Sequence, residues 1–159
     1  MTDGSEKRRA EARILGAIKE AVNLNAAGKA GLAVQLLAPL LTEFPEEPAV
    51  RIYLAWYLRR CERFEDAIGH ARCAVQMLPK SSRASLVLFH TLWSAGNKRD
   101  AIEEIRRFLP IRRTDKYTSH YADVLRKPKS EARGFSCRKS TSPSFEREVG
   151  TTACFHENY

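Results

Sequence analysis

The sequence contains no apolar run long enough to cross a membrane. Its beginning, MTDGSEKRRAEAR, carries charges but lacks the apolar stretch that a secretory signal needs. We therefore expect a cytoplasmic protein without membrane association. The 159 residues, 43% of them hydrophobic, are enough for one domain with a continuous core.

Cysteine and histidine are both scarce, with four residues of each. Cys61 and Cys73 fall at helical positions, where a free thiol behaves as a small hydrophobe. Cys137, Cys154 and His156 would supply three zinc ligands, but their spacing matches no close ligand pair and a fourth ligand is missing. The sequence therefore predicts reduced thiols and neither a metal nor another cofactor.

Signatures of catalysis are absent as well. The histidines are scattered, no serine or cysteine lies in a recognisable nucleophile setting, and there is no glycine-rich phosphate loop. The acidic residues Glu65, Asp66, Glu103 and Glu104 recur near the expected starts of helices, where they would favour the helix dipole. We therefore expect a protein that is not an enzyme and has no catalytic residues.

What the sequence does contain is an internal repeat. Ala33, Ala67 and Ala101 stand 34 residues apart, and other positions recur with the same period. The three units span residues 14–47, 48–81 and 82–115. The recurring rows are Leu24, Leu58 and Leu92; Ile18, Ile52 and Leu86; Val34, Ile68 and Ile102; and Gly28, Glu62 and Gly96. A period of this length predicts units that bury their apolar faces by stacking on one another.

Within each unit the apolar spacing is helical rather than alternating, which predicts an antiparallel pair of helices. The alanine row has a physical reason, because only a small side chain fits where two helices cross closely. Gly28 and Gly96, aligned with Glu62, mark where one helix stops and the next begins. Pro39 lies inside the second helix of the first unit and is expected to bend it, since proline removes a backbone hydrogen bond.

The stretch ERFEDAIGHARCAVQMLP has an aromatic residue three positions before the alanine, a small residue seven after it and a terminal proline. It resembles a tetratricopeptide repeat (TPR), and the resemblance extends over roughly residues 14–113. The resemblance implies an all-α fold, a right-handed superhelix of three antiparallel helical hairpins. We expect this repeat domain to cover residues 1–127, with a capping helix at about 115–126. The Ser/Thr-rich basic tail at 128–159 is expected to be disordered.

The excess of positive charge lies in the second and third units. Residues 48–113 carry thirteen basic and six acidic residues, whereas residues 1–47 carry six and seven. The resemblance implies that the first helix of each unit lines a concave groove, and it places aromatic and basic side chains of these two units there. These candidate groove residues are Tyr53, Trp56, Arg59, Arg60, Arg83, His90 and Trp93.

Tryptophans beside arginines are typical of binding hot spots. The sequence therefore predicts an interaction scaffold whose groove binds a partner peptide with apolar or aromatic anchors and an acidic group. Three alternatives remain open. In the first, the tryptophans are ordinary core residues. In the second, the basic face of the second and third units binds nucleic acid or another polyanion. In the third, the ends of the array associate with another copy.

TPR proteins that bind the C-terminal tails of chaperones use a clamp of lysine, asparagine, asparagine, lysine and arginine. In this sequence the corresponding positions are Ile18, Val22, Tyr53, Arg83 and Val87. Only Arg83 is compatible with such a clamp. We therefore do not expect chaperone tails among the partners.

Overall fold

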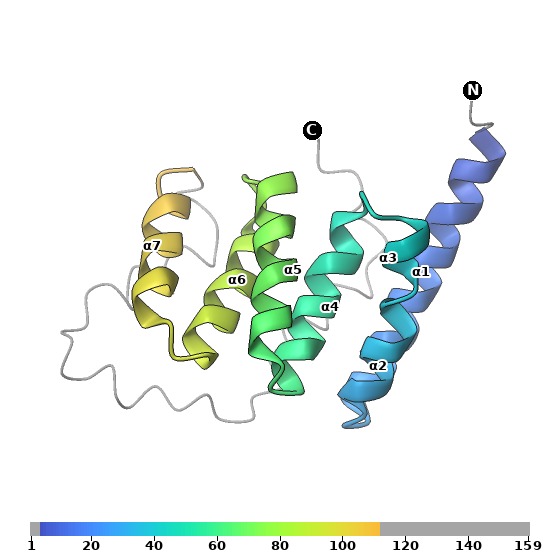
Figure 1. Ribbon diagram of the computed structural model, residues 1–159. Helices are drawn as coiled ribbons and strands as arrows, with labels where there is room; N and C mark the ends of the chain where they lie inside the picture. Colours follow the sequence, from blue (N-terminus) through green and yellow to red (C-terminus); the bar gives the residue numbers. More distant parts are fainter. Residues whose placement is uncertain (1–3, 112–159) are drawn as a thin grey trace.

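The computed structural model describes residues 4–111, and all of its regular elements in this range are helices (Figure 1). The helices are α1 (Gly4–Ala26), α2 (Ala30–Leu37), α3 (Leu40–Glu43), α4 (Pro48–Arg60), α5 (Phe64–Met77), α6 (Ser82–Ser94) and α7 (Lys98–Phe108). The capping helix expected at about 115–126 and the tail at 128–159 lie outside the described residues.

Consecutive helices pair into three hairpins, α1 with α2, α4 with α5, and α6 with α7 (Figure 1). The first helices of the hairpins also contact one another, α1 with α4 and α4 with α6. In addition, α2 contacts α4 and α5 contacts α6, so each hairpin packs on the next. This arrangement is the stacked array that the 34-residue period predicts.

The turns inside the three hairpins share one geometry. Gly28, Glu62 and Gly96 have positive φ angles of 77°, 60° and 84°. The next residue of each turn donates its backbone N–H to the carbonyl of an aligned leucine. These bonds join Lys29 to Leu24 at 2.8 Å, Arg63 to Leu58 at 3.0 Å and Asn97 to Leu92 at 2.9 Å. They are the long bonds of Schellman motifs, which close helix C-termini, so the alignment predicted the turn positions correctly.

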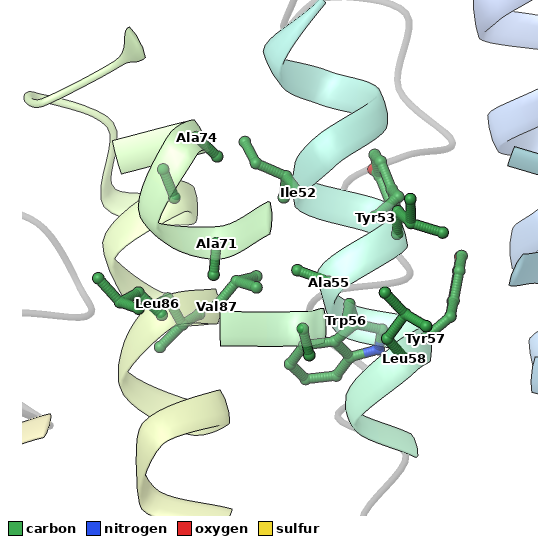
Figure 2. Close-up of a cluster of buried hydrophobic side chains, with 14 of the residues drawn as sticks. Ile52, Tyr53, Ala55, Trp56, Tyr57, Leu58, Ala71, Ala74, Leu86 and Val87 are labelled. Atoms are coloured by element: carbon green, nitrogen blue, oxygen red, sulfur yellow. The ribbon is translucent and has the colours of Figure 1, made fainter. Parts of the chain in front are cut away.

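The repeated alanines lie in the core. Ala33, Ala67 and Ala101 are all 0% exposed, as their predicted place between crossing helices requires. The core is continuous along the array and is centred on α4, where every residue from Ile52 to Leu58 is buried (Figure 2). Because α4 contacts helices on both sides, the second unit connects the first unit to the third.

The first unit departs from the regular hairpin at Pro39. The prediction was a bent second helix, and the structure interrupts that helix between Leu37 and Leu40. Proline has no N–H to donate to the carbonyl four residues earlier. The chain continues through a tighter turn, in which Thr42 donates to the Pro39 carbonyl at 3.1 Å.

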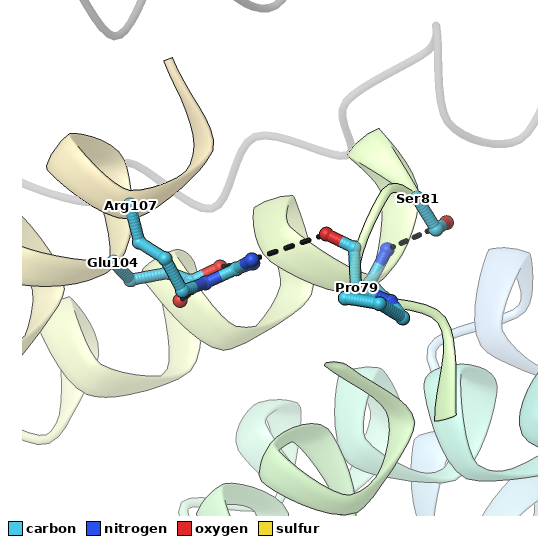
Figure 3. Close-up of polar contacts among 5 residues, drawn as sticks. Pro79, Ser81, Glu104 and Arg107 are labelled. Carbon is cyan, nitrogen blue, oxygen red and sulfur yellow. Dashed lines mark hydrogen bonds and ion pairs between the residues drawn. The ribbon is translucent and has the colours of Figure 1, made fainter. Parts of the chain in front are cut away.

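A polar contact fixes the third hairpin against the second. The Glu104 carboxylate, 7% exposed, accepts hydrogen bonds from Arg107 at 2.6 and 2.8 Å. Arg107 also donates to the Pro79 carbonyl at 3.1 Å (Figure 3). The hydrogen bonds to Glu104 raise the pKa of Arg107, which therefore stays charged. Helix α7 is thus bound to the turn between α5 and α6.

This contact corrects one expectation from the sequence. Helix α7 begins at Lys98, and the acidic residue in its first turn is Asp100. Glu103 and Glu104 lie further along the helix and form ion pairs with Arg106 and Arg107. Their predicted role at a helix start was wrong, whereas Glu65 and Asp66 do lie in the first turn of α5.

Candidate peptide-binding surface

The candidate groove residues occupy two helices that contact each other. Tyr53, Trp56, Arg59 and Arg60 lie on α4, and Arg83, His90 and Trp93 lie on α6. We call the side of these two helices that carries the seven residues the α4–α6 surface. The stacking of the second and third units therefore places the two predicted groups next to each other.

The seven side chains differ in exposure. Tyr53 and Trp56 are 4% and 5% exposed and belong to the buried core (Figure 2). The other five residues are half-buried. Trp56 therefore has the packed environment that the sequence left open as an alternative, while Trp93 packs at the edge of the core.

Arg59 joins the second unit to the third. Its guanidinium carbon lies 4.4 Å from the centre of the Trp56 ring, within the range of a cation–π interaction. Its Nη1 atom donates a hydrogen bond to the Ser94 hydroxyl at 3.2 Å. Ser94 is the last residue of α6. The buried tryptophan and the end of the neighbouring helix thus hold the guanidinium from two directions.

An aromatic network continues from Trp56 along α6. The Trp56 and His90 rings meet edge to face, with centroids 6.1 Å apart and an interplanar angle of 86°. Phe89 lies 5.1 Å from His90 and 5.6 Å from Trp93, centroid to centroid. Lys98 at the start of α7 places its ammonium nitrogen 5.5 Å from the centre of the Trp93 ring. Rings that contact in this way fix one another's orientation across two repeats.

Three residues of this network were missed at the sequence level. Ser94 and Lys98 show no signal in the sequence, because their contacts depend on how α6 meets α4 and α7. Phe89 stands four residues before Trp93, a spacing that places two side chains on the same helix face, and this signal could have been used.

The position of two arginines at the end of α4 also has a local explanation. Arg59 and Arg60 occupy the last turn of α4, where the helix dipole favours positive charge. Arg60 is half-buried and forms no ion pair with any residue between 4 and 111. The helix end therefore stabilises two neighbouring arginines, and only Arg59 has the stacked position on Trp56.

No protein-family profile matches the chain, and no curated protein matches it in sequence. Solved structures do match. The second TPR domain of human RPAP3, in complex with the HSP70 peptide SGPTIEEVD, superposes with a TM-score of 0.64 at 12% identity, over 75% of this chain and 99% of that chain. The first TPR domain of Spaghetti (RPAP3), bound to the HSP90 peptide SRMEEVD, gives 0.60 at 14% identity, over 73% and 98%.

The TPR domain of Sgt2 from Aspergillus fumigatus superposes with a TM-score of 0.62 at 16% identity, over 79% of this chain and 89% of that chain. The fold is that of a TPR domain. The predicted resemblance and the all-α fold class are thereby confirmed. At these identities the likeness concerns the fold alone, so the partner must be argued from the side chains of this TPR fold.

The positions of this chain that correspond to the clamp carry few polar groups. Ile18 and Val87 are 2% and 1% exposed and belong to the core, as does Tyr53. Val22 packs at the edge of the core and Arg83 is half-buried. Two of the solved TPR domains hold chaperone peptides, whereas here most of the corresponding positions are apolar. That this chain does not bind chaperone tails stays a prediction.

Other kinds of site find little support in the described part of the chain. No group of three or more histidine, cysteine, aspartate or glutamate side chains between residues 4 and 111 is placed to hold a metal ion. No helix in the same range is both long and apolar enough to span a membrane. The α4–α6 surface is the candidate site of this chain.

Proposed function

We propose that this chain is a non-enzymatic interaction scaffold that binds a partner peptide on the α4–α6 surface. The observation that carries the proposal is the continuous network of aromatic and cationic side chains that joins α4, α6 and the start of α7. Its half-buried members are the contact residues, and Trp56 serves as the buried support beneath them. The TPR fold supports this role, since two similar solved domains hold peptides.

The chemistry of the surface indicates a peptide with acidic and aromatic groups. Residues 48–113, which include this surface, carry thirteen basic and six acidic residues. Arginine binds carboxylates with two parallel hydrogen bonds, and half-buried aromatic rings offer faces for stacking. Charge complementarity of this kind favours an acidic peptide over a neutral or basic one.

Charge reversal tests the proposal. The full chain is used to select binders from a random peptide library, and affinities are measured by fluorescence polarisation. The double variant Arg60→Glu with Arg83→Glu should weaken the selected peptides roughly tenfold or more, because attraction becomes repulsion. Arg99→Glu, at an exposed position on α7, is the matched control and should leave affinity nearly unchanged.

Both variants should keep the melting temperature within a few degrees of the wild type, since the substituted side chains are not fully buried. Unchanged affinity in the double variant would exclude the α4–α6 surface as the binding site. The peptides SRMEEVD and SGPTIEEVD serve as further probes, and we expect neither to bind, because Ile18 and Val87 cannot act as clamp residues.

Nucleic-acid binding by the basic face and self-association of the array stay predictions from the sequence. The first predicts affinity for mixed RNA that falls steeply as salt rises. Measuring RNA and the selected peptides side by side distinguishes a polyanion-binding protein from a peptide-binding one.

A further inference from the structure

Acidic residues are distributed unevenly among the helices of the second and third units. Helices α4 and α6 contain four arginines and neither aspartate nor glutamate. Helices α5 and α7 contain five acidic residues, and four of these accept ion pairs of 2.6 to 3.1 Å. The pairs are Arg63–Asp66, Arg72–Asp100, Arg106–Glu103 and Arg107–Glu104. The first helices of these two units are therefore purely cationic, and most acids of the second helices are already paired.

Cations gather where α4 and α6 end and α7 begins. Arg59 and Arg60 occupy the last turn of α4, and the hydrogen bond from Arg59 to Ser94 brings the end of α6 beside them. Lys98, the first residue of α7, is exposed and places its ammonium nitrogen 5.5 Å from the centre of the Trp93 ring. The dipole of α7 disfavours a positive charge at this end, so Lys98 is not explained by helix stability. The same end of the α4–α6 surface thus offers charge for an acidic ligand.

The chain itself contains a segment of complementary charge. Residues 140–159, which lie outside the described residues, carry three glutamates and one arginine. The preceding residues 112–139 carry nine basic and three acidic residues, so the sign of the net charge changes near position 140. The same segment contains the aromatic residues Phe145, Phe155 and Tyr159. Acidic and aromatic groups together are the chemistry proposed above for the partner of the α4–α6 surface.

We propose that residues 140–159 occupy the α4–α6 surface of the same molecule and compete there with partner peptides. In this arrangement the glutamates of the segment face the cationic end that includes Arg60 and Lys98. The inference rests on the proposed peptide-binding function and adds the regulation of that site. It also assigns a role to the change of charge near position 140, which the repeat fold does not need.

The tether makes this competition effective. Residues 112–139 connect the last described residue to the segment, and a flexible chain of that length spans about 30 Å between its ends. Helix α6 is about 20 Å long, so the segment can reach the surface. A tethered ligand acts at an effective concentration on the order of millimolar. Even a weak contact would therefore keep the surface occupied until a partner displaces it.

Photo-crosslinking in the full-length chain tests where the segment binds. A benzoylphenylalanine residue replaces Phe145, the protein is irradiated, and mass spectrometry identifies the crosslinked residues. We expect crosslinks within one chain to α4, to α6 or to the start of α7. The matched control carries the same photoreactive residue in place of Phe135, in the basic part of the chain, and should give several-fold fewer crosslinks to these helices. Crosslinks that join two chains, or that avoid these helices, would overturn the inference.

Charge reversal of the segment tests the competition. The apparent affinity for a ligand falls with the fraction of molecules whose site is open. The double variant Glu146→Lys with Glu148→Lys should therefore bind the library-selected acidic peptides roughly three- to tenfold more tightly than the wild type. The double variant Asp123→Lys with Glu131→Lys adds the same charge outside the segment and should change the affinity by less than about twofold.

The two double variants also distinguish failure of the regulation from failure of the function. Equal affinities of both variants for the selected peptides would show that residues 140–159 do not compete, while peptide binding itself would stand. If no library peptide binds the wild type or either double variant, the proposed function fails instead.

Discussion

At the scale of single residues, Glu62 shows most directly what the repeat demands of the backbone. Among the described residues, Glu62 is the one residue other than glycine that has a positive φ angle, 60°. The equivalent positions in the first and third units are Gly28 and Gly96. A side chain in this conformation costs about 1 to 2 kcal/mol, because its Cβ approaches the following carbonyl oxygen. We expect Glu62→Gly to raise the free energy of unfolding by about 0.5 to 1 kcal/mol.

Urea denaturation followed by circular dichroism measures this change. Gly28→Ala is the opposite control and should lower stability. No atom lies within 4 Å of a Cβ built at Gly28, so its loss would come from backbone conformation alone. A Glu62→Gly variant less stable than the wild type would contradict the strain that we assign to this turn.

The residue scale is also where prediction from the sequence reached its limit. The turn positions followed from aligning Gly28, Glu62 and Gly96, since only certain residues accept that conformation. The contact of Arg59 with Trp56 lies within α4, and its three-residue spacing could have indicated it. The bond of Arg59 to Ser94 did not follow, because it depends on the approach of two helices that are separated in sequence. The burial of Trp56 was left undecided for the same reason.

At the scale of elements, the broken second helix of the first unit has a single local cause. Ala38 and Pro39 both have helical backbone angles, with φ and ψ of −57° and −44° and of −62° and −29°. What is missing is the N–H of residue 39. Pro39→Ala restores this donor and should join α2 to α3, with a stability gain of about 1 kcal/mol or more.

Helical content by circular dichroism and the midpoint of thermal unfolding check this prediction together. Pro45→Ala, in the turn before α4, is the control and should increase neither quantity, because no helix passes through that position. If Pro39→Ala unfolds at a lower temperature, the interruption is needed for packing against the neighbouring helices rather than being imposed by proline.

Helix α1 is longer than the sequence pattern predicted. It begins at Gly4, well before residue 14, where the first unit was expected to start. Its early residues are mostly exposed and carry no apolar period, so the pattern that reveals buried helix faces is silent there. Alanine, glutamate, lysine and arginine favour helix by intrinsic propensity, and the Arg13–Glu43 ion pair connects this segment to α3.

At the scale of the whole molecule, the array is stabilised by contacts between neighbouring units. Helix α4 contacts helices of the first and third units and α5 contacts α6, so a distortion inside the second hairpin reaches both neighbouring units. Ala67, 0% exposed, lies inside this hairpin. We expect Ala67→Leu to separate the two helices and to lower the free energy of unfolding by about 1 to 3 kcal/mol.

The loss should appear as one cooperative transition at a lower temperature in calorimetry. Ala27→Leu, at an exposed position, is the matched control and should change stability by no more than about 0.5 kcal/mol. A biphasic transition in Ala67→Leu would show instead that the units unfold independently.

The order of the stacked units and the pairing of their helices were the most predictable properties of the molecule. One period, read from rows such as Ala33, Ala67 and Ala101, determines which helices pair and which units touch. The hydrogen bond from Arg107 to the Pro79 carbonyl was not predictable, because it joins residues 28 positions apart through geometry that no repeated row encodes.

The three residues of this link, Pro79, Glu104 and Arg107, do not tolerate substitution equally. The acceptor at Pro79 is a backbone carbonyl, which every amino acid possesses, so no exchange of that side chain can delete it. Among the three partners of this link, only Glu104 and Arg107 must keep their side-chain chemistry for it to form. Position 79 can therefore change its side chain without losing the acceptor, while the side-chain requirement of this link rests on Glu104 and Arg107.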